Sequence, residues 1–403
     1  MSREVPSVSA KSNSPAKETP GKVMTEFPVS ESSEPPPSTP TLGLASKDSS
    51  LTTPKQRLRI NPNKDHQSEK YEDIEGLVFS PYIYSYLEKY LPHSVLEYTR
   101  DDKAKFMKAL LLKYLPLGER LRALKRKDYK MKIMSDYQLL HKGLQNTHPG
   151  TFFVPSFVKA INEGTEESLR AVVSEPSPGL FTFEMFQPRF CDLLISEVEN
   201  FYKWAKNSNF NSMQPNIMNK HGAILDDFGL EGMLCKTMEC FVIPMSKVFF
   251  PEFGGASLDS HHGFVVEYGE ERDLDLGFHV DDAEVTLNVC LGKQFSGGEL
   301  YFRGKRCDVH VNSPTNLDEI FDYSHIPGKA LLHVGRHRHG ARATTSGHRF
   351  NLILWCRSSE FREMKKYQND YSDWCGECQR EKHLRQRASI DAMKKEFLQI
   401  SDV

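Results

Sequence analysis

The segment His337–Cys356 reads HRHGARATTSGHRFNLILWC and joins three histidines and three arginines to an aliphatic run. The run that follows Arg349 has the composition of a strand buried in a core. An arginine that enters such a strand costs too much free energy to be left unpaired, so Arg349 requires a carboxylate partner inside the fold. The segment therefore predicts a buried strand that carries polar groups into a functional site.

Short strand-like runs precede this segment at close spacing. They are FVVEYG (264–269), EVTLNVCLG (284–292), GELYFRG (298–304), DVHV (308–311) and KALLHV (329–334). Because Gly-rich turns and no helical patterns separate them, they predict an antiparallel barrel or jelly roll. Upstream, residues 179–207 predict a short strand, a turn at Pro188 and an amphipathic helix. The expected fold class is α+β.

Composition divides the chain into four parts. Residues 1–65 are rich in Ser, Pro and Thr and hold too few large apolar residues to repay the entropy of ordering, which predicts a disordered tail. The glutamates of this tail argue against the alternative of a transit peptide, a class of segment that is poor in acids. Residues 66–175 repeat apolar residues at three- and four-residue steps and predict a helical N-terminal unit. Residues 176–358 contain the strands, and residues 359–403 return to a charged helical pattern.

Charge and hydropathy exclude several classes of protein. The formal net charge of -2 gives no overall basic field that would attract nucleic acid, and the basic run at residues 122–132 is typical of a solvated face. No apolar stretch approaches the 18 or so residues that span a bilayer, and the N-terminus has no signal-peptide core. We therefore expect a protein of the cytoplasm or nucleus that does not enter a membrane.

Two candidate metal ligands, His279 and Asp281, lie in the tripeptide HVD. Residues two apart in a strand project from the same face, so this imidazole and this carboxylate can converge on one point. By itself the pattern also fits a surface histidine beside two aspartates. With the distant His339 it matches the two-histidine, one-carboxylate set of non-haem Fe(II) sites, which leaves coordination positions open. Two such positions can chelate a 2-oxo acid and a third can admit O2, while Arg349 would hold the far carboxylate through a bidentate contact.

Four segments together resemble a known family. They are FTFEMFQPRFCDLLISEVE (181–199), HVD (279–281), GGELYF (297–302) and HGARATTSGHRFNLILW (339–355). Over residues 179–358 the chain resembles the prolyl-4-hydroxylase-like branch of the 2-oxoglutarate and Fe(II)-dependent oxygenases, and most closely the plant PKHD-type hydroxylases. The resemblance implies a double-stranded β-helix, or jelly-roll, oxygenase domain at residues 176–358. It also implies oxidative decarboxylation of 2-oxoglutarate to succinate and CO2, and L-ascorbate as a factor that rescues oxidised iron.

Carried over by position, the resemblance makes His279, Asp281 and His339 the iron ligands and Arg349 the 2-oxoglutarate anchor. His333 and His337 compete with His339, which is favoured because the family places its distal histidine ten residues before the basic anchor. Asp282 competes with Asp281 but lacks the spacing of two residues from His279. These alternatives stay open on the sequence.

Tyr268 corresponds to a strand tyrosine that hydrogen-bonds the 2-oxoglutarate carboxylate in related enzymes, although an ordinary core tyrosine fits equally well. Arg338 and Arg342 are expected to face solvent rather than the mouth of the site. Loops on a rigid barrel often select the substrate, so residues 269–277 and 303–328 are the candidates for that role.

The eight cysteines show no disulfide spacing typical of a small domain, which suits a reducing compartment. Cys375 and Cys378, in the stretch DWCGECQREKH that ends at His383, resemble a thioredoxin loop, but no buried strand precedes them. They also form half of a zinc site, but a structural zinc needs four ligands and the sequence offers no second pair of this spacing. We therefore expect two cysteines without a chemical role at the start of a helix.

The sequence thus favours a 2-oxoglutarate- and Fe(II)-dependent dioxygenase that hydroxylates a C–H bond, with a protein prolyl or lysyl side chain as substrate. A nucleic-acid dealkylating oxygenase is the first alternative, because RFNLILW shares an Arg-x-Asn pattern with that branch. Trp355 stands where that branch carries a second arginine, and the chain is not basic. The second alternative is a binding module on the same fold, against which the intact ligand set argues.

Overall fold

The computed structural model describes Phe79 and residues 81–114, 117–146, 148–216, 218–366 and 368–400. The disordered tail predicted for residues 1–65 lies outside these residues. Within them, no helix is long and apolar enough to cross a membrane.

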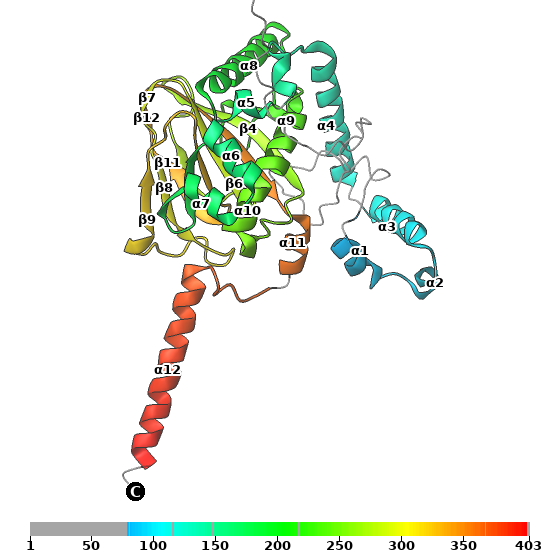
Figure 1. The fold of residues 1–403 in the computed structure, drawn as a ribbon. Helices are drawn as coiled ribbons and strands as arrows, with labels where there is room; N and C mark the ends of the chain where they lie inside the picture. Colours follow the sequence, from blue (N-terminus) through cyan, green and yellow to red (C-terminus); the bar gives the residue numbers. More distant parts are fainter. Residues whose placement is uncertain are drawn as a thin grey trace, which may run out of the picture. The chain divides into compact units, whose positions relative to one another are not determined.

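Helices precede and follow the strands, and three of them interrupt the strand series (Figure 1). The α-helices are α1 (Pro81–Glu88), α2 (His93–Leu96), α3 (Arg100–Tyr114), α4 (Leu117–Asp136), α5 (Pro149–Phe152), α6 (Pro155–Glu163), α7 (Glu166–Val172), α8 (Pro188–Asn207), α9 (Glu231–Thr237), α10 (Ile243–Phe249), α11 (Ser359–Lys365) and α12 (Gly376–Ile400). A π-helical turn, η4 (Met238–Val242), joins α9 to α10. The predicted amphipathic helix is α8, and Pro188, expected in the turn before it, is its first residue, where its missing N–H leaves no hydrogen bond unmade.

The strands form two antiparallel sheets. They are β1 (Ser174–Ser177), β2 (Leu180–Glu184), β3 (Gly222–Ile224), β4 (Ser260–Gly269), β5 (Leu276–His279), β6 (Val285–Gly292), β7 (Phe295–Gly297), β8 (Leu300–Lys305), β9 (Ile320–Tyr323), β10 (Lys329–Val334), β11 (His337–Ala341) and β12 (Thr344–Arg357). The larger sheet has the order β1-β2-β10-β6-β12-β4-β3 with β7 on β12, and the smaller has the order β5-β11-β8-β9. The fold is the predicted α+β double-stranded β-helix.

Strand β12 shows how alternation along one strand separates a core from a site. Its even residues, among them Phe350, Leu352 and Leu354, lie in the main hydrophobic core. Its odd residues, among them Arg349 and Asn351, line a cleft on the opposite face of the larger sheet. Since successive side chains of a strand point to opposite faces, one strand can serve both.

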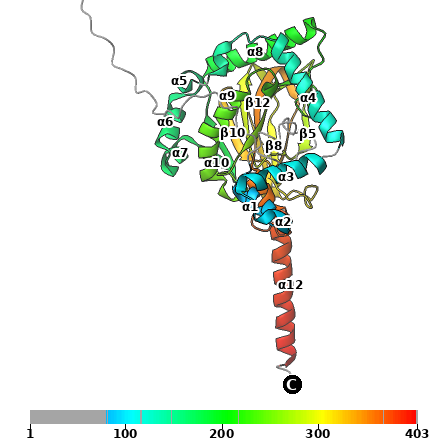
Figure 2. The ribbon, with the colours of Figure 1, turned by 90° about the vertical axis from the view of Figure 1, so that its right-hand side faces the viewer.

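Helices α8, α9 and α10 cover the outer face of the larger sheet, as Figure 2 shows beside β10 and β12. The core beneath them takes Leu287 from β6, Leu332 from β10, Val198 from α8, Leu234 from α9 and Met245 from α10. All five side chains are at most 1% exposed. A sheet packed by helices on one face and by a second sheet on the other leaves both faces buried, which explains the continuous apolar runs of the sequence.

Helices α5 to α7 contribute to this same core. Phe153, the residue after α5, is fully buried, and its ring centroid lies 4.0 Å from that of Phe241. Phe157 of α6 stacks on Phe183 of β2 with 5.1 Å between the ring centroids. The helices predicted within residues 66–175 are therefore present, and the last of them pack on the strands. The point at which the helical unit ends and the oxygenase domain begins stays a prediction.

A buried carboxylate fixes the chain between α4 and α5. Glu197 of α8 is 0% exposed and accepts hydrogen bonds from the hydroxyl of Tyr137 and from the backbone N–H groups of Leu140, at 3.1 Å, and His141, at 2.7 Å. These bonds take the place of helical hydrogen bonds where the chain after Asp136 is no longer α-helical.

A second buried carboxylate, Asp226, lies beside strand β4. Its Oδ1 is 3.3 Å from Nδ1 of His261, and its Oδ2 accepts a hydrogen bond of 3.0 Å from the N–H of Gly263. Burial alone lowers the pKa of His261, but the attraction of Asp226 outweighs it and raises this pKa to about 10. The pair therefore holds its charges inside the fold.

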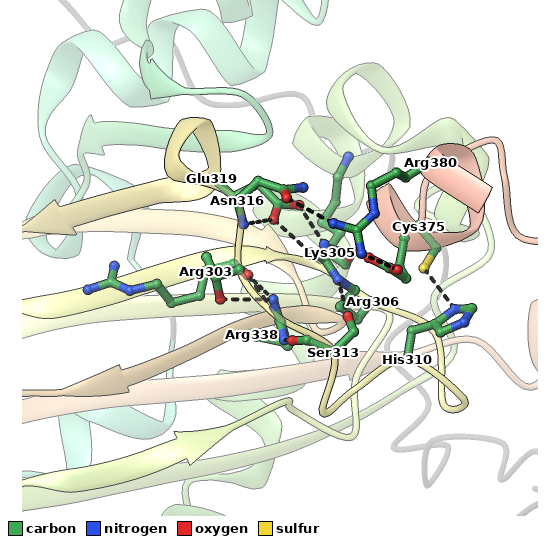
Figure 3. Close-up of polar contacts among 12 residues, drawn as sticks. Arg303, Lys305, Arg306, His310, Ser313, Asn316, Glu319, Arg338, Cys375 and Arg380 are labelled. Atoms are coloured by element: carbon green, nitrogen blue, oxygen red, sulfur yellow. Dashed lines mark hydrogen bonds and ion pairs between the residues drawn. The ribbon is translucent and has the colours of Figure 1, made fainter. Parts of the chain in front are cut away.

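Two predictions are wrong, one about residues 308–311 and one about Arg338, which contacts that segment. The run DVHV at residues 308–311 is not a strand but part of a loop, and Arg338 is 1% exposed rather than facing solvent. The guanidinium of Arg338 donates to the carbonyl oxygens of Arg303, Val311 and Ser313, at 2.6 to 3.2 Å (Figure 3). Because these carbonyls serve a buried cation, the loop has no need of a strand partner.

Candidate metal and 2-oxo acid site

A cleft between the two sheets holds the residues singled out from the sequence. It is lined by side chains from β4, β5, β6, β8, β11 and β12. His279, Asp281 and His339 lie on its wall together with Arg349 and Tyr268. All five candidate site residues therefore face one cavity.

Three of these residues form a group that could hold a metal ion. The Nε2 atom of His279 is 3.5 Å from Oδ1 of Asp281, and Nε2 of His339 is 3.8 Å from Oδ2 of the same carboxylate. The one ligand atom that each residue offers lies within 4.8 Å of the others. Strand pairing brings them together, because His339 of β11 is the direct partner of His279 of β5.

The backbone orients both imidazoles. Nδ1 of His279 donates to the carbonyl of Gly277 at 2.8 Å, and Nδ1 of His339 donates to the carbonyl of His337 at 2.9 Å. A proton held on Nδ1 leaves the lone pair on Nε2, the atom that points toward Asp281 in both residues. The oxygen Oδ2 of Asp281 accepts a hydrogen bond of 2.7 Å from Thr286, which fixes the carboxylate as well.

The electrostatics of the group keep its donor atoms in the forms that bind metals. Burial lowers the pKa of His339 to about 3, so this imidazole is neutral near pH 7. Burial alone raises the pKa of Asp281, but His339 and His279 outweigh burial and lower this pKa well below its usual range. Burial likewise lowers the pKa of His279, but the interaction with the Asp281 carboxylate outweighs burial and raises this pKa. Metal ligands must be deprotonated, and two of the three groups already are.

The structure also places the competing residues. His333 and His337 are buried, but neither offers a nitrogen to the group; the Nδ1 of His333 donates to the carbonyl of Val334 at 2.9 Å. Asp282 points away from the group, since its two oxygens lie 3.1 Å from Arg357 and 3.0 Å from Arg362. Geometry thus favours the set chosen by spacing.

Arg349 is 1% exposed and lies where β12 meets β4. Its Nη1 donates to the carbonyl of Gly298, and its Cζ lies 4.3 Å from the ring centroid of Tyr268. The predicted carboxylate partner within the barrel is absent from the part of the chain that the structure describes: Arg349 forms no ion pair there, and its buried Nε has no hydrogen-bond acceptor. A buried guanidinium with free donors suits an anion supplied from outside the chain.

Tyr268 is the direct strand partner of Arg349 and is 3% exposed. Its hydroxyl accepts a hydrogen bond of 3.3 Å from the side-chain amide of Asn219, and burial raises the pKa of the hydroxyl. The phenol is therefore neutral and has a proton to donate within the cleft.

The sequence did not single out several polar residues that line the same cleft. They are Asn216, Asn219, Thr286, Asn288 and Asn351. The side-chain amide of Asn351 donates to Asn288 at 2.7 Å, and its own oxygen is buried without a partner among the described residues. Three of the five could have been found from alternation, because polar residues at alternate positions of a buried strand must face a polar space.

Outside the cleft, Arg342 is exposed and pairs with Asp322 at 2.5 Å, so it faces solvent as predicted. Cys375 and Cys378 lie at the start of α12, as predicted, but beside Cys307 and His310 of the β8–β9 loop. His383 is exposed on α12 and does not belong to that group.

Comparison with known proteins gives the family. Residues 133–255 match the model of the OGFOD2-like domain. Over 342 residues the chain is 60% identical to the 2-oxoglutarate and iron-dependent oxygenase domain-containing protein CP2 of Arabidopsis thaliana, which covers 85% of this chain and 86% of that protein. The chain belongs to the 2-oxoglutarate and iron-dependent oxygenase domain-containing proteins.

Two further relatives show how far the likeness extends. The 2-oxoglutarate and iron-dependent oxygenase domain-containing protein ICU11 of Arabidopsis thaliana is 58% identical over 338 residues, which are 84% of this chain and 85% of that protein. A multifunctional procollagen lysine hydroxylase and glycosyltransferase of Caenorhabditis elegans is 26% identical over 191 residues, or 45% of this chain and 24% of that protein. The family name implies iron and 2-oxoglutarate, which agree with the donor atoms and the buried guanidinium of the cleft.

Proposed function

We propose that this protein is a dioxygenase that hydroxylates a C–H bond of a protein side chain, prolyl or lysyl, while it decarboxylates 2-oxoglutarate. One oxygen atom of O2 enters the new hydroxyl group and the other enters succinate, and CO2 leaves. The bonds broken are the C–H bond of the substrate, the O–O bond, and the bond between the keto carbon and its carboxylate. L-Ascorbate belongs to the proposal as the reductant that returns oxidised iron to Fe(II).

In this proposal His279, Asp281 and His339 hold the metal through two imidazole nitrogens and one carboxylate oxygen. Bound Fe(II) would supply the activation of O2, while the four electrons that reduce O2 would come in pairs from 2-oxoglutarate and from the C–H bond of the substrate. Three protein ligands leave positions open for the 2-oxo acid and O2, since such an ion prefers six ligands. The carbonyls of Gly277 and His337 support the assignment, because they direct both Nε2 lone pairs to one point.

The observation that carries the proposal is the unpaired, buried Arg349 in the same cleft as the metal-binding group. A guanidinium that is 1% exposed, forms no ion pair with a described carboxylate and has an Nε without an acceptor suits an anion supplied from outside the chain. 2-Oxoglutarate has two carboxylates, of which one would lie at the metal and the other on Arg349. Tyr268, whose ring lies beneath the guanidinium, would donate its hydroxyl proton to the same carboxylate.

The choice of a protein substrate rests on two points. The similar region of the Caenorhabditis elegans relative belongs to a protein named for lysine hydroxylation. The net charge of -2 gives no general attraction to a polynucleotide, and Trp355 lines the cleft where the dealkylating branch carries an arginine.

The test is succinate formation from 2-oxoglutarate with Fe(II), L-ascorbate and air, without added substrate. Uncoupled turnover should give iron-dependent succinate in the parent chain and none in His279→Ala. The matched control is His383→Ala, which removes an exposed imidazole of α12 and should behave as the parent. If the parent forms no succinate and calorimetry finds no 2-oxoglutarate binding to the metal-loaded chain, the proposal fails and a binding module remains.

If succinate forms, a library of proline- and lysine-containing peptides follows, read by mass spectrometry as the gain of one oxygen atom. Hydroxylation of a peptide, absent with His279→Ala, supports the side-chain substrate. Oxygen transfer only to alkylated single-stranded DNA would refute that half of the proposal and leave the oxygenase chemistry intact.

A further inference from the structure

A second group of metal-binding side chains lies away from the cleft, where the β8–β9 loop meets the start of α12. Cys307 and His310 come from the loop, and Cys375 and Cys378 come from the residues just before and within the first turn of α12. The two pairs are far apart in sequence, yet the one ligand atom that each residue offers lies within 4.8 Å of the others.

The distances within this cluster are those of a tetrahedral zinc site. Zinc binds sulfur at about 2.3 Å and nitrogen at about 2.0–2.1 Å, so tetrahedral angles place two sulfurs about 3.8 Å apart and a sulfur about 3.6 Å from a nitrogen. Sγ of Cys307 is 3.7 Å from Sγ of Cys378. Nδ1 of His310 is 3.3 Å from the sulfurs of Cys307 and Cys378, and 3.8 Å from that of Cys375. A disulfide would need about 2.05 Å between two sulfurs, and Cys307, Cys375 and Cys378 are all free thiols.

The surroundings of the cluster orient its ligands. The Nε2 atom of His310, which does not face the sulfurs, lies 3.3 Å from a carboxylate oxygen of Glu381 on α12. A carboxylate on the second nitrogen fixes the orientation of a zinc-bound imidazole. The sulfur of Cys375 accepts a hydrogen bond of 3.4 Å from the backbone N–H of Cys307, which stabilises a thiolate. Figure 3 shows His310 directed at this cysteine from the loop.

The cluster joins the loop to the helix in a region where the loop has few apolar contacts. The loop has little apolar packing, and Val309 and Leu317 are 81% and 89% exposed. Its order rests on polar contacts, chiefly the bidentate pair of Arg306 with Glu319 at 2.5 and 2.6 Å (Figure 3). A Cβ added to Gly376 would lie 2.7 Å from Oε1 of Glu319, so a glycine between the two cysteines lets the helix start approach the loop.

From these observations we infer that Cys307, His310, Cys375 and Cys378 bind one zinc ion that fastens α12 to the β8–β9 loop. The site is structural, because four protein ligands leave no position for a substrate or water. Three thiolates and one imidazole give the zinc complex one net negative charge. The spacing Cys-x2-His in the loop matches Cys-x2-Cys in the helix.

The inference also connects the cluster to the cleft. The loop that the zinc would hold accepts, through the carbonyls of Val311 and Ser313, the hydrogen bonds of Arg338. Arg338 directly precedes His339 on β11. Loss of zinc should therefore loosen α12 first and the end of β11 second.

The experiment is the zinc content of the full-length chain after purification without strong chelators, measured by mass spectrometry of the metal. To keep zinc in the cleft from being counted, the chain carries Asp281→Ala. About one zinc per chain is expected in this background, and less than one tenth after the further change Cys375→Ser or His310→Ala. The matched control is Cys240→Ser, which removes an exposed thiol elsewhere and should retain the zinc.

Two measurements keep the test valid if a variant folds poorly. In the Asp281→Ala background, His310→Cys should retain zinc, because a fourth thiolate can replace the imidazole. Co(II) bound to the Asp281→Ala chain should give the absorption of tetrahedral thiolate coordination. A metal-free parent, an octahedral Co(II) spectrum, or zinc retained in Cys375→Ser would overturn the inference. So would a disulfide between Cys307 and Cys378 in the freshly purified chain, mapped by peptide mass.

Discussion

Arg349→Met should greatly weaken 2-oxoglutarate binding while it leaves the stability of the ligand-free protein almost unchanged. The guanidinium is 1% exposed, and burial lowers its pKa, which shows that the fold disfavours the charge. Its removal forfeits a charged hydrogen bond to Gly298, about 2 kcal/mol, and the stacking on Tyr268, about 2 kcal/mol. It also removes the desolvation penalty of a buried cation, which amounts to several kcal/mol in real proteins. The two effects cancel to within about 1 kcal/mol.

Binding of 2-oxoglutarate distinguishes the parent chain from the Arg349→Met variant. With 2-oxoglutarate at 100 times the parent Kd, the parent chain should gain about 2.7 kcal/mol of stability, and the variant should gain less than about 1 kcal/mol. Truncating one partner of a buried charge pair costs about 2–5 kcal/mol of binding free energy, so affinity should fall by about 30-fold to several thousand-fold.

The assay is urea unfolding of the metal-loaded chain with and without 2-oxoglutarate, followed by calorimetry. Arg342→Met is the matched control, since Arg342 is exposed and pairs only with a surface carboxylate. A ligand-free Arg349→Met chain that is less stable by more than about 3 kcal/mol would show that Arg349 is a structural residue, because such a loss requires an internal partner. Unchanged affinity for 2-oxoglutarate would remove its proposed role.

Three further substitutions test other parts of the structure. Gly298→Ala should weaken 2-oxoglutarate binding in calorimetry at least tenfold, because φ is +74° there and a Cβ would lie 2.8 Å from Nη1 of Arg349; equal affinity would show that the guanidinium can shift. His261→Gln should remove a pH-dependent part of the unfolding free energy. Because its folded pKa of about 10 exceeds the unfolded value of about 6.5, this part is fully present below about pH 6.5 and is lost as the pH rises through 10, at about 1.4 kcal/mol per pH unit. Urea unfolding at several pH values checks it, and parallel profiles for parent and variant would contradict it. Glu197→Ala should lower the unfolding free energy by about 3–5 kcal/mol, since two backbone N–H groups and a tyrosine hydroxyl lose their buried acceptor. The control Glu199→Ala, at an exposed ion pair, should cost less than about 1 kcal/mol.

The strands show how much of the fold the sequence predicts. Alternation and aliphatic composition predicted six strand-like runs. Five of them lie in or beside β4, β6, β8, β10 and β12. The failure at residues 308–311 has a local cause: two apolar residues alternate with Asp308 and His310 as in a strand, but the backbone carbonyls of this loop serve Arg338. The alternation of apolar and polar residues in this run does not predict which of its carbonyl groups will accept hydrogen bonds from an arginine distant in the sequence.

The candidate cleft shows the same division. The spacing of His279 and Asp281 is a local property of a strand, so the sequence alone places them on one face. The choice of His339 over His333 and His337 needed the pairing of β11 with β5, which aligns His339 with His279. That Arg349 forms no ion pair within the described residues is also visible only in the tertiary structure.

The sequence by itself determined the features that depend on neighbouring residues. These are the strands and helices, which repeat apolar residues every two or every three to four positions, the pairs His279–Asp281 and Cys375–Cys378, and Arg349 at the start of an aliphatic run. What only the tertiary structure decided are the meetings of segments far apart in the chain, above all Cys307 and His310 with Cys375 and Cys378. Each half of that cluster has two ligands, too few for a structural zinc, and neither half predicts the other. The physical reason is that side-chain direction follows from local backbone geometry, whereas proximity across some 65 residues follows from how the whole chain packs.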